Sequence, residues 1–282
     1  MSYSSSLLSL FGGGSSGGST ISDPILNALY GSGTAASGSD PVQALQTAVQ
    51  NQTQDVALTA AQPAIARDIA TFESAVGSAT SPAQLLANPT AMKVLLTASG
   101  MSDQVGYTAL ATQALMANSA DPKSLVNQLT DNRWLTVNQT YDFATKGLSV
   151  IQNPKVLATI ANSYAEQTWY QSLNAATPGL SNALQFRAEA STITSAAQIL
   201  GDPVMRSVVT TALGIPQQIA FQDITAQEQA ITAQLDITRF QDPKFVASFT
   251  DQYLIAMQQQ NAGTQAAPSL DSLAVQANGL VV

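Results

Sequence analysis

Side chains that could do acid–base or nucleophilic chemistry are few in this sequence, and carboxylates are the main type. The 282 residues include no histidine and no cysteine. This excludes a Ser-His-Asp triad, an imidazole proton relay, a thiolate nucleophile, a zinc finger and a disulfide. The chain has 18 Asp and Glu against 10 Lys and Arg. A pair of carboxylates is therefore the principal catalytic option left to it.

Four glutamates could contribute to such a pair: Glu73, Glu166, Glu189 and Glu228. They lie one to each expected helix, and no local spacing brings two of them together. We expect them on solvent-exposed helix faces. A hydrolase whose carboxylate pair is assembled by the fold stays an alternative, which a structure without two converging carboxyls in a pocket would exclude.

Other patterns that bind metals or phosphates are missing. The sequence has no Asp-x-Asp-x-Asp-Gly calcium loop, and the glycine run at 12–18 has no following Gly-Lys-Ser/Thr. Lys123 and Lys146 lack the Ser-x-x-Lys spacing of serine–lysine enzymes. Asp223 and Asp236 are isolated, whereas four other aspartates fit helix caps: Asp40, Asp121, Asp202 and Asp242. We therefore predict no catalytic residue, no cofactor and no metal site.

Arginines and aromatic residues favour structural roles. We expect Arg187 and Arg206 to pair with Asp202, Glu189 or helix C-terminal carbonyls rather than with an anionic ligand. The aromatic residues form two groups along the chain, without the interleaved basic residues of a nucleic-acid surface. We expect these residues to anchor the core: Trp134, Tyr141, Phe143, Tyr164, Trp169 and Tyr170.

The elements that position these residues are predicted to be helices. A side-chain acceptor followed by proline is typical of a helix start, because the acceptor caps an unpaired N–H and proline has none to leave unpaired. Apolar residues at Ile65, Ile69, Phe72 and Val76 follow a single helical stripe. We predict an all-α fold of many short helices. Nine prolines follow Asp, Asn, Ser or Thr: Pro24, Pro41, Pro82, Pro89, Pro122, Pro154, Pro178, Pro203 and Pro243.

A sequence repeat divides the expected helical core. Residues 83–131 resemble residues 197–251, beginning with Ala-Gln-Leu-Leu-Ala-Asn-Pro in the first copy and Ala-Gln-Ile-Leu-Gly-Asp-Pro in the second. Both copies carry an Asp-Pro-Lys further on, at residues 121–123 and 242–244. Two copies are too few for a solenoid, so we predict two related helical halves that pack on each other.

Both ends of the chain read as tails. Residues 1–40 are about half Ser and Gly, and 261–282 are rich in Gly, Ala, Ser and Gln. We predict disordered tails at 1–40 and 261–282 around a helical core at 41–260, with a short helix possible within 21–30. No apolar run approaches the ~20 residues of a membrane span. Residues 1–11 have no Lys or Arg and only a short apolar stretch, so we expect no cleaved secretory signal peptide.

The net charge of the chain disfavours some classes of binding partner. At −8 the chain disfavours nucleic acid and anionic membranes, both of which recruit basic side chains. Other proteins are the expected partners, and a homo-oligomer is possible.

The order and spacing of several motifs resemble one known family. The motifs are Asp121-Pro122-Lys123-Ser124-Leu125-Val126, Leu184-Gln185-Phe186-Arg187-Ala188-Glu189 and Ile199-Leu200-Gly201-Asp202-Pro203. Together they resemble the bacterial domain-of-unknown-function family 1217, over roughly residues 60–258. The resemblance implies a helical protein from a family associated with flagellar gene loci. No catalytic residue is assigned to that family.

These observations lead to one functional prediction and one alternative. We expect a bacterial, non-enzymatic structural or assembly protein that is associated with the flagellum and acts through protein–protein contacts. The alternative is a cytoplasmic helical adaptor or chaperone that is not exported.

Overall fold

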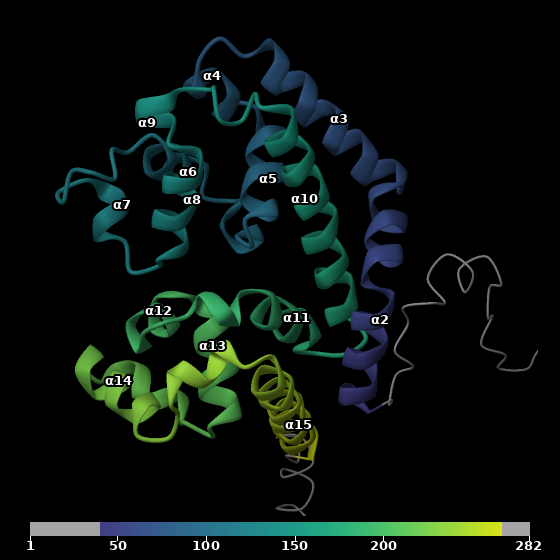
Figure 1. Ribbon diagram of the computed structural model, residues 1–282, viewed down its shortest axis with the longest axis vertical. Helices are drawn as coiled ribbons and strands as arrows, with labels where there is room; N and C mark the ends of the chain where they lie inside the picture. Colours follow the sequence, from purple (N-terminus) through teal and green to yellow (C-terminus); the bar gives the residue numbers. More distant parts are fainter. Residues whose placement is uncertain (1–39, 267–282) are drawn as a thin grey trace, which may run out of the picture. The chain divides into compact units, whose positions relative to one another are not determined.

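All regular structure is helical in residues 40–266, the part of the chain that the computed structural model describes (Figure 1). The all-α prediction is confirmed for this part. Within it, no helix is both long enough and apolar enough to cross a membrane. The α-helices are α2 (Pro41–Ala60), α3 (Pro63–Ser78), α4 (Pro82–Leu86), α5 (Pro89–Ala98), α6 (Thr108–Leu115), α7 (Leu125–Gln128), α8 (Arg133–Tyr141), α9 (Phe143–Lys146), α10 (Pro154–Asn174), α11 (Leu180–Glu189), α12 (Ala196–Gly201), α13 (Pro203–Ala212), α14 (Ile224–Thr232) and α15 (Pro243–Ala266). The 3₁₀ helices are η1 (Ser102–Gln104), η2 (Ala190–Thr192), η3 (Gln217–Phe221) and η4 (Ile237–Gln241).

The predicted tails lie almost entirely outside the described residues, as does the short helix expected within 21–30. Two described segments belong to the predicted tails. Asp40 caps α2, its Oδ1 accepting from Val42 N at 2.9 Å. At the other end α15 continues to Ala266, so the last helix extends past the boundary expected at residue 260.

Proline and the acceptor before it begin most of the helices for which this pattern predicted a start. In α5, for example, the Asn88 side chain accepts hydrogen bonds from Thr90 N and Ala91 N, and Pro89 occupies the first turn. The same arrangement begins α2, α4, α10, α13 and α15. α3 also begins at a proline, Pro63, but Gln62 makes no capping bond with its side chain.

Two prolines with the same signal do not begin a helix. Pro178 lies in a turn before Gly179. The φ of 90° at Gly179 lets the chain enter α11 at Leu180, two residues after the proline. Pro122 also lies in a turn, because the Asn127 amide donates to Ser119 O and Asp121 O and holds the chain in a loop. The helix after it, α7, starts at Leu125. Pro24 lies outside the described residues.

One contiguous hydrophobic core joins these helices, from Ala44 in α2 to Leu254 in α15. α10 packs against α5 and α2, and α11 contacts α10, α13 and α15 (Figure 1). The rings of Phe186 (α11), Phe240 (η4) and Phe249 (α15) contact one another at centroid distances of 5.2–5.7 Å, with Phe240 edge-to-face to the other two. The six aromatic residues expected to anchor the core are all buried: Trp134, Tyr141, Phe143, Tyr164, Trp169 and Tyr170.

The two repeated segments share local geometry at their beginnings. Ser81 caps α4 and Ser195 caps α12, and in each case the glutamine three residues later bonds back to the residue before the serine. α5 and α13 each end at a glycine with positive φ, 70° at Gly100 and 65° at Gly214. The next N–H then bonds a carbonyl five residues back in each, Met101 to Leu96 and Ile215 to Thr210, both at 2.8 Å.

The copies differ further on. Asp121 lies in a turn before the short α7, whereas Asp242 caps α15, a helix that continues to Ala266. The two segments therefore use similar sequence for different connections. That they are halves of one duplication stays a prediction.

Candidate functional site

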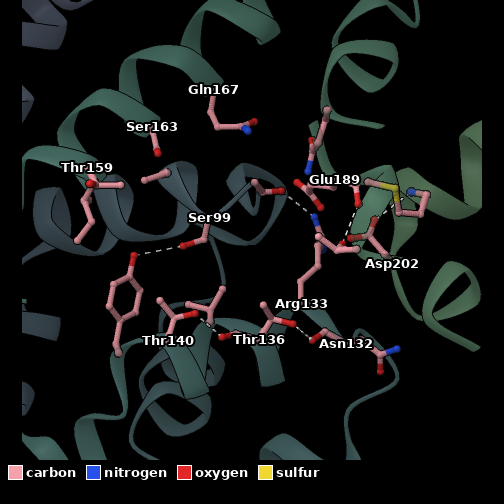
Figure 2. Close-up of a pocket in the computed structure, with 18 of the residues that line it drawn as sticks. Ser99, Asn132, Arg133, Thr136, Thr140, Thr159, Ser163, Gln167, Glu189 and Asp202 are labelled. Carbon is pink, nitrogen blue, oxygen red and sulfur yellow. Dashed lines mark hydrogen bonds between the residues drawn. The ribbon is translucent and has the colours of Figure 1, made fainter. Parts of the chain in front are cut away.

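A cleft of about 620 Å³ lies between α8 and α10, and we call it the groove. Figure 2 shows its two walls: Asn132, Thr136 and Thr140 lie along one, and Thr159, Ser163 and Gln167 lie along the other. Residue numbers rise in opposite directions on the two walls, so the helices are antiparallel there. The groove is lined by Ala98, Ser99, Gly100, Asn132, Arg133, Thr136, Val137, Thr140, Tyr141, Lys155, Val156, Thr159, Ile160, Ser163, Gln167, Gln185, Glu189, Thr192, Ile193, Gln198, Asp202 and Met205.

The threonines of the walls use their hydroxyl hydrogens inside their own helices. Thr140 Oγ1 donates to Thr136 O at 2.7 Å, Thr159 Oγ1 to Lys155 O at 2.9 Å, and Thr136 Oγ1 to Asn132 O at 3.3 Å. Such i−4 bonds leave the methyl groups facing away from the backbone. The walls are therefore more aliphatic than their residue names suggest.

The base of the groove continues this aliphatic character. Val137 and Ile160 are buried and Val156 is half-buried, and all three line the groove. Ser99, which lies between the walls in Figure 2, donates to Leu95 O at 2.8 Å, so its hydroxyl hydrogen is also used. A ligand would meet the methyl and methylene groups of these residues beside the polar groups of Ser163 and Gln167.

At one end of the groove, the guanidinium of Arg133 donates hydrogen bonds to two carboxylates and a backbone carbonyl. Its Nε and Nη2 donate to the Asp131 carboxylate at 3.0 and 2.7 Å, and Nη1 and Nη2 donate to the Asp103 carboxylate at 3.1 and 2.9 Å. Nη1 also donates to Gly100 O at 2.9 Å. A guanidinium has five N–H groups, and all five have an acceptor here. Arg133 therefore has no donor left for a ligand.

Glu189 and Asp202 lie at the same end, beside Arg133 (Figure 2). Burial and then the charge of Asp202 raise the pKa of Glu189 to about 7, against the opposing effects of a Gln185 hydrogen bond and the Arg133 charge. Burial also raises the pKa of Asp202, although its Oδ1 accepts from Val204 N and Met205 N at 2.7 and 3.0 Å. Two carboxyl groups thus share one end of the groove.

The expectation that the glutamates lie on solvent-exposed helix faces was wrong for Glu189. Glu189 is half-buried because α11 turns it toward α13, and sequence spacing alone does not indicate that contact. Glu166 is also half-buried, accepting from Gln52 Nε2 at 2.6 Å and from Tyr170 OH at 3.0 Å. Glu228 is half-buried as well, and Glu73 is exposed as expected.

Two glycines allow this end of the groove to form. A Cβ on Gly100 would lie 2.6 Å from Gln185 Nε2, and a Cβ on Gly201 would lie 1.8 Å from Asn132 Nδ2. Asn132 N also donates to Gly201 O at 2.7 Å, which joins the start of α8 to the end of α12. Gly100 therefore leaves room for the Gln185 side chain, and Gly201 leaves room for that of Asn132.

Arg187 and Arg206, which were expected to have structural roles, lie in different environments. Arg206 Nη2 donates to Leu200 O at the end of α12, which agrees with the expected bond to a helix C-terminal carbonyl. Arg187 instead lies near Asp251 of α15, where its charge opposes the effect of burial, which raises the pKa of that carboxyl.

Other residues singled out from the sequence lie outside the groove. Asp223 caps α14 and Asp236 caps η4, with bonds from Ala226 N and Thr238 N. Lys146 lies 3.5 Å from Asp142. Within residues 40–266, no three carboxylates gather in the way that a metal site requires.

Sequence reasoning did not identify the groove as a site. Gln185 and Glu189 are four residues apart on one helix, which was a local signal that they could interact. The contribution of Arg133 and Asp202 depends on contacts between distant segments, and no spacing in the sequence indicates it.

Comparison with known proteins identifies the family and a similar fold. No curated protein sequence matches the chain. A crystal structure of a protein from Agrobacterium tumefaciens is 24% identical, with a TM-score of 0.69, and the match covers 78% of this chain and 93% of that one. At this identity the likeness shows the fold alone. The sequence model of a family described as "Protein of unknown function (DUF1217)" matches residues 98–246, more than half of the chain and including Arg133, Glu189 and Asp202. The chain belongs to this family.

Proposed function

We propose that this protein is a non-enzymatic structural or assembly protein of the bacterial flagellum that acts by binding other proteins. The observation that carries the proposal is the groove between α8 and α10. Two antiparallel helices present methyl groups along it at helical spacing, at Thr136, Thr140 and Thr159. A groove of this kind suits an amphipathic helix of a partner, whose apolar face would cover the aliphatic walls.

The hydrogen bonds inside the groove support a protein partner over a small polar ligand. A sugar would need donors as well as acceptors along the walls, but the hydroxyl hydrogens of the wall threonines and of Ser99 already bond within their own helices. A phosphate beside Glu189 and Asp202 would need a cation with unused N–H groups there, and those of Arg133 are all used.

Exposed apolar side chains elsewhere also support protein contacts. Phe221 is 92% exposed, and Ile224 and Tyr107 are each 61% exposed. Phe221 and Ile224 are close neighbours at the start of α14, whereas single exposed apolar residues are common on any surface. This pair offers a second contact region, separate from the groove.

The flagellar setting is the part of the proposal that depends on the family. The resemblance noted from the sequence implies an association with flagellar gene loci, and we extend that implied association to this chain. An assembly protein that works by contact needs no catalytic residue, and the family has none assigned.

Deleting the gene and fractionating flagellated cells tests the proposal. We expect reduced motility on deletion, and the tagged chain in the fraction that contains flagellar basal bodies. Thr136→Trp, which fills the groove from an exposed wall position, should lower the amount in that fraction, whereas Ser74→Trp on the exposed face of α3 should not. Unchanged motility, with the chain only in the cytosol, would instead favour the cytoplasmic adaptor or chaperone.

One observation favours a different class, a hydrolase that uses a carboxylate pair. Glu189 and Asp202 do converge in a pocket, so the structure does not exclude this alternative. Asp202, however, holds the start of α13 through two backbone N–H groups, a structural task that fixes one of its oxygens. Turnover of a substrate by the purified chain, abolished by Glu189→Gln, would replace our proposal with this one.

A further inference from the structure

The cation whose charge acts on both carboxyl groups at the end of the groove makes no hydrogen bond to either of them. Among the described residues, Arg133 is the cation whose charge acts on both Glu189 and Asp202. Its five N–H groups bond to Asp131, Asp103 and Gly100 O, so it gives the pair charge but no hydrogen bond. This end of the groove therefore holds two carboxyl groups to which the neighbouring guanidinium donates no hydrogen bond.

We propose that the groove binds a helix of a partner protein that carries one basic side chain, with its ammonium or guanidinium between Glu189 and Asp202. The inference rests on the proposed function and names the chemistry of the partner. The aliphatic face of the partner helix packs on the walls, over the methyl groups of Thr136, Thr140 and Thr159. The basic side chain reaches the two carboxyls at the end of the groove where Arg133 lies, and the helix lies along the walls.

The hydrogen-bond inventory explains why the partner group is a donor. Glu189 accepts from Gln185, and the Oδ1 atom of Asp202 takes both backbone N–H bonds. Carboxylate oxygens accept from several directions, so each group retains lone pairs beyond these bonds. A guanidinium can donate to two carboxylates at once, which makes arginine a better fit than lysine.

Electrostatics explains why the partner group is positive. A carboxyl group in a partly buried site is stabilised as an anion only when a cation compensates the lost hydration. The raised pKa of Glu189 is consistent with a pair that lacks this compensation. An acidic helix would be repelled here. A second copy of this chain would also be disfavoured, because each carries a net charge of −8.

Two synthetic peptides test the inference with the full chain. Both are the same Ala- and Leu-based amphipathic helix, with one central arginine in the first and its neutral isostere citrulline in the second. Isothermal titration gives the affinities, and NMR shift changes locate the binding. We expect the arginine peptide to bind at least tenfold more tightly, with shifts at Thr136 and Thr159.

Variants identify the groups responsible. Glu189→Gln keeps the size of the side chain and should remove most of the tenfold preference, whereas Glu73→Gln on α3 should leave it unchanged. Thr136→Trp should weaken both peptides. Equal binding of the two peptides, a preference that persists in Glu189→Gln, shifts outside the groove, or no binding at all would each overturn the inference.

The outcome is separable from that of the proposed function. If the peptides fail while the chain still enters the basal-body fraction and deletion still reduces motility, the partner binds another surface, such as that around Phe221. If the peptides bind as expected but motility and fractionation are unaffected, the groove has a basic helical partner outside the flagellum.

Discussion

Arg133 shows how one side chain can hold several segments at once. Its guanidinium joins α8 to η1 through Asp103, and to the end of α5 through Gly100 O, while Asp131 fixes it from its own segment. The side chain is only 7% exposed, so these bonds form with little competition from water. This network is structural, and it sets the end of the groove.

Replacing Arg133 by lysine should destabilise the protein. An ammonium is a single point with three donors and cannot reproduce the planar fork that serves three acceptors. We expect Arg133→Lys to lower the free energy of unfolding by about 2–3 kcal/mol in urea denaturation. Lys93→Gln is the control, because Lys93 is half exposed in its pair with Asp68 and should cost less than about 1 kcal/mol. Equal losses would contradict this network.

Glu189 should make stability depend on pH. Its pKa is raised from 4.5 to about 7, so between these values the folded chain binds more protons than the unfolded chain. Stability from this group is then full below about pH 4.5 and is lost as the pH rises through 7. We expect a loss of about 2–3 kcal/mol over that range. The charged groups that face Glu189 are Asp202 and Arg133, and Gln185 bonds to it.

Urea denaturation at pH 5 and pH 8 measures this effect. Glu189→Gln should be nearly as stable as the original chain at pH 5 and more stable at pH 8, because the amide never ionises. Glu73→Gln should show no such difference, since Glu73 is exposed. A Glu189→Gln variant that retains the original pH dependence would show that another group titrates.

Among single residues, helix caps could be predicted from the sequence, whereas the residues of the groove could not. Asn88 and Asp202 cap helices because an acceptor before proline acts through its immediate neighbours. The environment of Glu189 depends on α13 and α8, which lie far along the chain in each direction. Local patterns carry no information about such contacts, and the residue was therefore expected on a solvated face.

At the scale of elements, the contact between α12 and α8 depends on Gly201. Alanine in a helix is normally more stable than glycine by about 0.5–1 kcal/mol. At Gly201, however, the new Cβ would lie 1.8 Å from Asn132 Nδ2 and 2.3 Å from its Cγ, so the side chain or the helix must move. We expect Gly201→Ala to lower the free energy of unfolding by about 1–2 kcal/mol.

Gly77 provides the matched control for that substitution. It lies in α3, and a Cβ there would meet nothing within 4 Å. Gly77→Ala should therefore raise the melting temperature while Gly201→Ala lowers it. Adding Asn132→Ala to Gly201→Ala should restore most of the loss. A stabilising Gly201→Ala would mean that α12 and α8 are farther apart than in this structure.

Helix starts were the most predictable elements, and the exceptions have local causes. Gly179 moves the start of α11 beyond Pro178, and the Asn127 side chain holds Pro122 in a turn. α3 is the opposite case: it starts at Pro63 without a side-chain cap, so the acceptor rule did not find it. Which helices would face each other across the groove could not be predicted, because periodicity gives a buried face but not its partner.

At the scale of the whole molecule, the core and the exposed aromatic residues should respond differently to truncation. Phe240 is 1% exposed and packs edge-to-face against Phe186 and Phe249, whereas Phe221 is 92% exposed. We expect Phe240→Ala to cost about 3–5 kcal/mol in urea denaturation, and Phe221→Ser to change stability by less than about 0.5 kcal/mol. A large loss from Phe221→Ser would show that this side chain is covered in the folded chain.

The same substitution at Phe221 tests partner contact without the complication of unfolding. If the surface around Phe221 and Ile224 binds another protein, Phe221→Ser should lower recovery in the basal-body fraction while the melting temperature stays constant. Unchanged recovery would leave the groove as the remaining contact region.

The all-α class could be predicted from composition and periodicity, because helix formers and capped prolines act over a few residues. The relation between the repeated segments is less direct. Their beginnings share caps and glycine ends, but similar Asp-Pro-Lys triplets lead to a turn in one and to α15 in the other. The next three residues differ, Ser-Leu-Val in the first copy and Phe-Val-Ala in the second. These residues, and the packing of Phe245 and Phe249 with Phe240, decide the connection.

The threonines of the groove have a consequence for the empty protein. A methyl beside a hydroxyl oxygen keeps water in place, since the oxygen still accepts a hydrogen bond while its hydrogen is directed to the backbone. A row of valines in the same positions would offer a dry surface on which molecules of the protein could adhere to one another. We therefore expect the unoccupied groove to stay hydrated, and its threonines to oppose self-association of the protein at this surface.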